Sequence, residues 1–171
     1  GLVRGLGDPN DALTHFGATF FVAYTEGDVG GLTVGPAGDV NNDTVQDFII
    51  GAPEVDLPGK LDAGKAYLFY GSHTLEPGEI RLSDVGARVP GLVVPGFEQG
   101  DLLGSSVGGG FDVNGDGIAD ALVGAPFADS LLTTDPDAGE TYVISPVGSD
   151  EVVLMTLSPA APSPTTFLEW T

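Results

Sequence analysis

The sequence predicts an all-β fold built from two blade-like antiparallel sheets of four strands each. Three observations lead to this prediction. Residues 27–53 recur as residues 100–126, at a constant offset of 73 residues. Short apolar runs alternate with clusters of Gly, Pro, Asp and Asn, as in strands joined by tight turns. The 3.6-residue period of an amphipathic helix is not sustained for three turns anywhere in the chain.

The repeat preserves polar residues as well as glycines. The pattern Asp-x-Asn-x-Asp-x-x-x-Asp occurs at 39–47 and again at 112–120. Each copy is followed by Gly-Ala-Pro, at 51–53 and 124–126. After a small insertion, residues 63–69 match residues 138–144. We interpret the similarity as a duplication, with unit one at 27–99 and unit two at 100–157.

Each unit contains four apolar runs that suit strands. The second run of each unit, Phe48-Ile49-Ile50 or Ala121-Leu122-Val123, is apolar without alternation, which predicts a strand buried on both faces. Sheets stacked face to face would bury such strands. The expected strands are 32–36, 47–51, 65–70 and 79–82 in unit one, and 105–109, 120–124, 140–145 and 151–157 in unit two.

Two flanks lie outside the repeat. The N-terminal flank, 1–26, contains an apolar strand at 18–24 that resembles the third strand of a blade. The C-terminal flank, 158–171, begins with a Pro-rich linker at 158–164 and ends with a strand-like segment at 165–170. We expect both flanking strands to pair with neighbouring strands, either in the same chain or in another copy.

The charge of the chain narrows its possible partners. Asp and Glu number 25 against 5 Lys and Arg, a formal charge of −20. This charge argues against binding nucleic acid or anionic lipid and favours cations. The hydrophobic content of 42% is too high for an acidic disordered chain. No apolar run approaches the roughly 18 residues of a membrane-spanning helix, and the absence of cysteine excludes thiolate metal sites and a cysteine nucleophile.

The two Asp/Asn loops contain the residues that could bind a metal ion. Oxygen ligands at positions 1, 3 and 5 of a tight loop converge, position 7 can add a backbone carbonyl, and an acid at position 9 completes the shell. Calcium prefers six to eight such oxygens, magnesium demands a stricter octahedron, and zinc would need His or Cys. The predicted ligands of the two calcium sites are Asp39, Asn41, Asp43, Val45 and Asp47, and Asp112, Asn114, Asp116, Ile118 and Asp120.

The alternative interpretation is that these loops are Asx-rich turns that cap strands. Against it, three carboxylates in each loop place about −3 of charge in a small volume, which a divalent ion would relieve. The second loop has Gly117 where a left-handed backbone is expected, whereas the first has Thr44. Because a β-branched residue is sterically strained there, we expect the second site to bind more tightly.

With the loops and the following Gly-Ala-Pro in place, the two units resemble the FG-GAP repeat, which builds the β-propeller of integrin α chains. The resemblance covers about residues 27–157. It implies calcium held in the hairpin between the first and second strands of each blade, and an extracellular location. The Phe-Gly part of the motif is degenerate, reading Gly30-Gly31 in one unit and Leu103-Gly104 in the other.

Propellers close with about 4–8 blades, and this chain supplies two. We therefore expect an incomplete ring, completed by other copies or by a longer chain, because bare blade faces and free edges need cover.

The first hypothesis is a calcium-binding extracellular structural or adhesive module that self-associates into an oligomer or filament through blade faces and terminal strands. The second is a non-catalytic propeller fragment of a larger secreted enzyme or surface receptor that binds protein or glycan. Enzymatic activity is not expected, because neither His15 nor His73 has a matched nucleophile, and Ser105-Ser106 lacks a nearby base in sequence.

Overall fold

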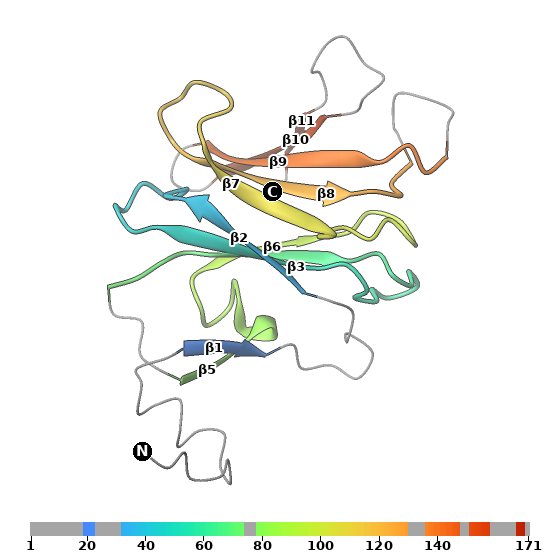
Figure 1. Cartoon of the computed structure of the whole chain (residues 1–171), viewed down its shortest axis with the longest axis horizontal. Helices are drawn as coiled ribbons and strands as arrows, with labels where there is room; N and C mark the ends of the chain where they lie inside the picture. The colour runs from blue at the N-terminus through green and yellow to red at the C-terminus, as the bar shows by residue number, and fades with distance from the viewer. Residues whose placement is uncertain are drawn as a thin grey trace, which may run out of the picture.

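The structure, a computed structural model, describes residues 19–22, 32–73, 78–129, 136–147, 151–157 and 167–169. Two antiparallel sheets lie face to face, and a small parallel pair of strands lies beyond the first of them (Figure 1). The first sheet has the order β2-β3-β4-β6 and the second has the order β11-β10-β9-β8-β7. The all-β prediction is confirmed in the described residues, where the single helix is the 3-10 turn η1.

Six of the eight blade strands predicted from the sequence occupy the expected places in order, with boundaries that differ by one or two residues, and a seventh agrees at both ends. These seven are β2 (Thr33–Gly38), β3 (Asp47–Ala52), β4 (Lys65–Phe69), β7 (Ser106–Phe111), β8 (Asp120–Ala125), β9 (Glu140–Val147) and β10 (Glu151–Leu157).

The prediction of a fourth blade strand at 79–82 is wrong. Those residues form β5 (Gly78–Arg81), which pairs with β1 in a separate two-stranded sheet, and η1 (Leu82–Asp84). The fourth strand of the first sheet is β6 (Gly91–Pro95), which pairs antiparallel with β4. The physical reason is burial on both faces: Leu92-Val93-Val94 is apolar throughout, whereas Glu79-Ile80-Arg81 is charged at every second residue.

Both flanking strands pair within the chain. β11 (Phe167–Glu169) lies antiparallel beside β10 and extends the second sheet to five strands. β1 (Thr19–Val22) runs parallel to β5, so it does not take the third-strand position that its sequence resembles. The Pro-rich linker 158–164 and Trp170 lie outside the described residues.

The main core lies between the two sheets, where β3 and β8 face each other across a layer of aliphatic and aromatic side chains. Ile49, Ala121 and Val123 are fully buried there, as the sequence predicts. The backbones of the two units also meet directly. A Cβ on Gly51 would lie 2.1 Å from the carbonyl oxygen of Gly104, so only glycine allows this approach.

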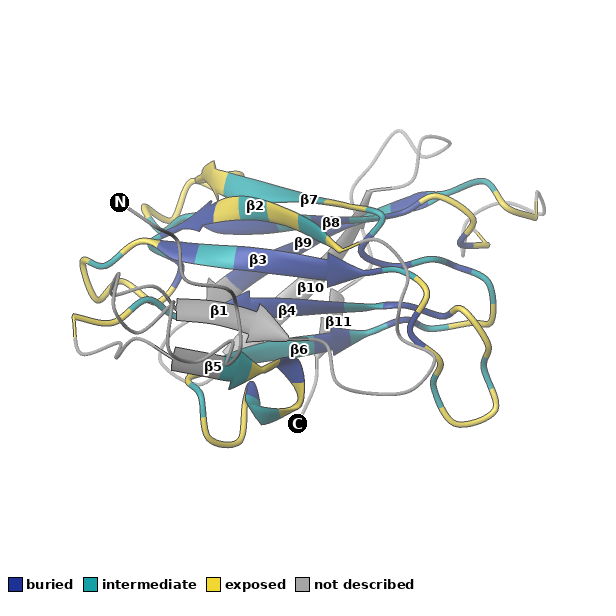
Figure 2. Cartoon of the chain, turned by 60° about the horizontal axis from the view of Figure 1, so that its bottom comes forward, coloured by how far each residue is buried: buried dark blue, intermediate teal, exposed yellow. Residues whose placement is uncertain are grey.

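The other face of the first sheet is covered by the chain itself. Leu82 and Val85, from η1 and the turn after it, are buried against Ile50, Tyr67 and Phe69. Figure 2 shows the result: β3 and β4 are largely buried, while β2 and β7 keep exposed and partly buried residues along the sheet edges. The turn around η1 therefore covers part of this face, whereas Val34, which pairs with Ile50 on β3, is 73% exposed at the β2 edge.

Candidate metal centre

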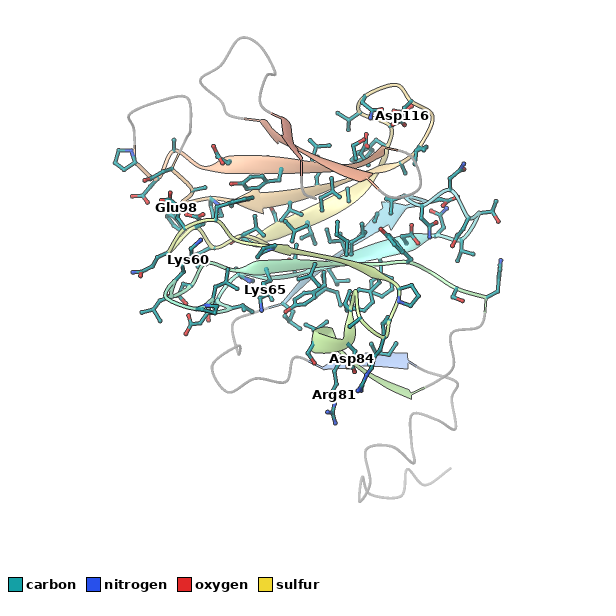
Figure 3. The ribbon with its side chains drawn as sticks, turned by 180° about the vertical axis from the view of Figure 1, so that it is seen from behind. Lys60, Lys65, Arg81, Asp84, Glu98 and Asp116 are labelled. Carbon is teal, nitrogen blue, oxygen red and sulfur yellow. The ribbon has the colours of Figure 1, made fainter. Side chains whose placement is uncertain are left out.

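The two acidic loops lie at the same end of the molecule. They join β2 to β3 and β7 to β8, on the left in Figure 1. The strands β2 and β7 run side by side in the same direction, because a Cβ on Gly35 would meet Val107 and Gly108, and a Cβ on Gly38 would meet Gly110 further along β7. Figure 3 shows Asp116 at this end and Lys60 and Glu98 at the opposite end of the sheets.

The second loop is a closed set of Asx turns. Asp112 accepts hydrogen bonds from the backbone N–H groups of Asp116 (3.1 Å, Oδ1) and Gly117 (2.8 Å, Oδ2). Asn114 Oδ1 accepts from the N–H of Asp116 at 2.9 Å, and Asp116 Oδ1 accepts from that of Ile118 at 2.8 Å. The predicted ligands at positions 1, 3 and 5 are thus gathered on the inside of one turn.

The first loop repeats this arrangement. Asp39 accepts hydrogen bonds from the N–H groups of Asp43 (3.0 Å) and Thr44 (2.8 Å). Asp43 Oδ1 accepts from the N–H of Val45 at 2.8 Å, and Asn41 Nδ2 donates to Asp43 Oδ2 at 3.0 Å. The carboxylates of both loops are therefore held by amides of the loops themselves.

Position 9 differs from the others because its side chain is buried beneath the loop. Asp47 is 3% exposed and Asp120 is 0% exposed. Each ties down its own loop through Oδ2, Asp47 by accepting from the N–H of Val40 (2.8 Å) and Asp120 by accepting from that of Val113 (2.6 Å). A buried carboxylate of this kind holds the loop against the start of the next strand through hydrogen bonds.

The second oxygen distinguishes the two acids. Asp47 Oδ1 accepts a 2.7 Å hydrogen bond from the N–H of Gly71, whereas Asp120 Oδ1 is buried and has no hydrogen-bond partner among the described residues. Burial raises the pKa of Asp47, the hydrogen bonds from Gly71 and Val40 oppose that rise, and the nearby charges of Asp43 and Asp39 add to it. An orphaned buried carboxylate oxygen is costly and indicates a missing partner.

The backbone confirms the expected steric difference between the loops. Thr44 has φ 73° and Asn42 has φ 57°, whereas the equivalent residues Gly117 and Gly115 have φ 89° and 84°. A β-branched residue in the left-handed region is an outlier, so Thr44 is strained where Gly117 is not. The relative affinity of the two sites stays a prediction.

The donor chemistry of the loops fits a hard cation. Carboxylate and amide oxygens are the side-chain donors present in both loops, and Asp120 contributes the unpaired oxygen. In the described part of the chain, no group of three or more Asp, Glu or His side chains is already arranged to hold a metal ion. Val45 and Ile118 donate hydrogen bonds from their N–H groups to the acids at position 5. That their carbonyl oxygens bind the metal ion stays a prediction.

Sequence reasoning missed the residues that contact the loops from the third strand of each unit. Gly71 reaches Asp47, and Ser145 Oγ accepts a 2.6 Å hydrogen bond from Asn114 Nδ2. The repeat alignment contained a signal, because residues 63–69 align with 138–144 without a gap and so place Gly71 opposite Pro146 and Tyr70 opposite Ser145. The alignment alone did not show that these strand ends lie beside the loops.

Two of the residues considered for catalysis, Ser105 and His73, lie in the described part of the chain, one in a turn and one at a segment end. The hydroxyl of Ser105 donates to the carbonyl of Leu102 at 2.7 Å, closing a turn. His73 is exposed at the end of the described segment 32–73, and His15 lies outside the described residues. No helix of the described residues is long and apolar enough to span a membrane.

Both repeated units of the chain are similar to sequences of known proteins. The FG-GAP repeat matches residues 30–69 and 103–144, one match for each unit. The chain is 30% identical over 132 residues to a human phosphatidylinositol-glycan-specific phospholipase D, covering 77% of this chain and 15% of the relative. The bovine protein of the same name is 36% identical over 110 residues, covering 64% of this chain and 13% of the relative. The chain thus spans about a seventh of the length of these relatives.

Proposed function

Because this chain carries two FG-GAP repeats, we propose that it is a calcium-stabilised, non-catalytic propeller module of an extracellular protein. The family resemblance predicted from the sequence is confirmed by the two matched units. The module consists of two blades, with the edge strands β2 and β7 in contact with each other. Its role is structural, as an acidic part of a larger protein.

The observation that carries the calcium proposal is the unpartnered Oδ1 of buried Asp120. The second site would be formed by Asp112, Asn114, Asp116 and Asp120, with the carbonyl of Ile118. A bound calcium ion would reduce the charge of the loop from about −3 to about −1 and give the orphaned oxygen a partner. The first site would use the equivalent residues at 39–47.

Completion of the ring by neighbouring blades is the second part of the proposal. Both sheets are open, and a propeller needs about 4–8 blades to close. The relatives are several times longer than the region they share with this chain, which favours blades supplied by a longer chain. Self-association of copies is the competing route. Because both flanks pair internally and η1 covers part of the first sheet, it receives less support.

Isothermal titration of the chelated protein with calcium chloride, followed by native mass spectrometry, tests both parts. The expected result is two bound calcium ions and a monomer mass near 17.4 kDa. Titration with magnesium chloride is the control and should release much less heat. No calcium binding would contradict the metal proposal. A defined oligomer would instead favour completion by copies.

A further inference from the structure

The two units differ at one backbone position beside the buried acids. In unit one, Phe48 pairs with Phe69, so Gly71 lies two residues beyond the pair. In unit two, Ala121 pairs with Ile144, so Pro146 lies at the equivalent place. Gly71 has an N–H group and Pro146 has none.

This substitution accounts for the orphaned oxygen. The N–H of Gly71 donates to Asp47 Oδ1 at 2.7 Å. At the matching place, Pro146 cannot donate, and Asp120 Oδ1 is buried without a partner among the described residues. Because the other oxygen of each acid is held by its loop, through Val40 or Val113, the difference is confined to Oδ1.

We propose that Pro146 reserves Asp120 Oδ1 for the cation and thereby makes the second loop the first to fill with calcium. The inference rests on the proposed function, because it assigns the affinity difference within the same pair of sites. In the first loop, calcium must compete with the N–H of Gly71 for Asp47 Oδ1. In the second loop no backbone donor competes, and a desolvated oxygen gains its only partner.

The surroundings of the second loop support this role. Ser145, which is 1% exposed, accepts a hydrogen bond from Asn114 Nδ2 at 2.6 Å. This bond fixes the amide of Asn114, whose Oδ1 then faces the N–H of Asp116 inside the loop. The equivalent of Ser145 in unit one is Tyr70, so a phenol replaces the serine hydroxyl at this strand end. The strand end of unit two therefore both orients Asn114 and leaves Asp120 Oδ1 free.

The test restores the missing donor with Pro146→Ala. Both the parent and the variant carry Asp43→Ala, so that the first loop does not contribute to the titration. We expect Pro146→Ala to raise the calcium dissociation constant at least fivefold and to raise the melting temperature of the chelated protein, because the orphaned oxygen gains an N–H. Pro95→Ala, at the end of β6, is the control and should change neither quantity.

The possible outcomes separate this inference from the proposed function. No calcium binding in the parent would overturn the proposed function itself. Calcium binding with equal dissociation constants in parent and Pro146→Ala would overturn only the role of Pro146. A raised melting temperature of the chelated protein without a change in dissociation constant would show that Asp120 Oδ1 is not a calcium ligand, and would also overturn the role of Pro146. If Pro146→Ala does not fold, Pro146→Gly provides the same N–H with the residue found in unit one.

Discussion

The hydroxyl of Thr33 donates a 2.7 Å hydrogen bond to the carbonyl oxygen of Gly104, across the boundary between the two repeats. Gly104 has φ +96°, and a Cβ there would lie 2.6 Å from the carbonyl oxygen of Lys65. The Cα of Gly51 would lie 2.9 Å from the same Cβ. The two units therefore meet through backbone as well as through side chains, which should make them unfold as one cooperative unit.

Replacing Gly104 with alanine should therefore disrupt the boundary between the units. A left-handed backbone costs an L residue about 1–2 kcal/mol, and overpacking adds about 1–3 kcal/mol. Gly59→Ala is a matched control, because Gly59 has φ +78° with nothing within 4 Å of a Cβ. Urea denaturation should show a larger loss of unfolding free energy for Gly104→Ala. Equal losses would mean that the close approach has no energetic consequence.

Removing calcium should lower the melting temperature of the whole chain. An ion present at 100 times its dissociation constant adds about 2.7 kcal/mol per site. For a domain of this size, that corresponds to roughly 5–10 °C per site. Differential scanning calorimetry in calcium and in chelator measures the shift, with magnesium as the control ion. Superimposable unfolding curves in calcium and in chelator would mean that neither loop binds calcium.

The equivalent substitutions Asp43→Ala and Asp116→Ala should differ in their effect. Each removes the acid at position 5 and the hydrogen bond to the N–H of Val45 or Ile118. In saturating calcium, Asp116→Ala should lower the melting temperature more, because the second site is expected to be tighter. In chelator the two variants should be similar, since neither loop then holds an ion. A larger effect of Asp43→Ala in calcium would reverse the predicted order of the sites.

Exchanging the residues with positive φ should transfer strain between the loops. Thr44→Gly should stabilise the chain by about 1 kcal/mol, because glycine adopts the observed φ of 73° without a steric penalty. Gly117→Thr should destabilise it by a similar amount, since its φ is 89°. Chemical denaturation in chelator separates these backbone effects from metal binding. An unchanged unfolding free energy in both variants would show that the loops adapt to either residue without strain.

Alkaline pH should destabilise the chain through Tyr142. Burial, and then its hydrogen bond to Glu140 (2.7 Å) and the charges of Glu140, Asp101 and Glu98, raise the pKa of Tyr142 above its ordinary value of 10.0. The unfolded chain loses this proton near pH 10 while the folded chain keeps it. The contribution to stability is therefore complete below pH 10 and declines above it, by up to about 1.4 kcal/mol per pH unit.

Tyr142→Phe should make the decline in unfolding free energy above pH 10 shallower. Unfolding measured by fluorescence between pH 8 and 11 compares the variant with the parent. Tyr70 also has a pKa raised by burial and by the charge of Asp47, so a residual slope is expected in the variant. Identical slopes in the two proteins would show that Tyr142 ionises without loss of the fold.

The repeat, seven of the blade strands and the acidic loops could be predicted from the amino-acid sequence, because periodicity and turn residues act over a few neighbouring positions. It even identified Thr44 as strained, since the repeat places it opposite Gly117. Two features could not be predicted in this way: residues 91–95 complete the first sheet in place of 79–82, and Asp120 Oδ1 lacks the partner that Gly71 gives to Asp47. Both features depend on contacts between segments that are distant in the sequence. Burial of 91–95 leaves no place for 79–82 in the first sheet, and the end of the third strand of each unit either has or lacks an N–H group for the buried acid.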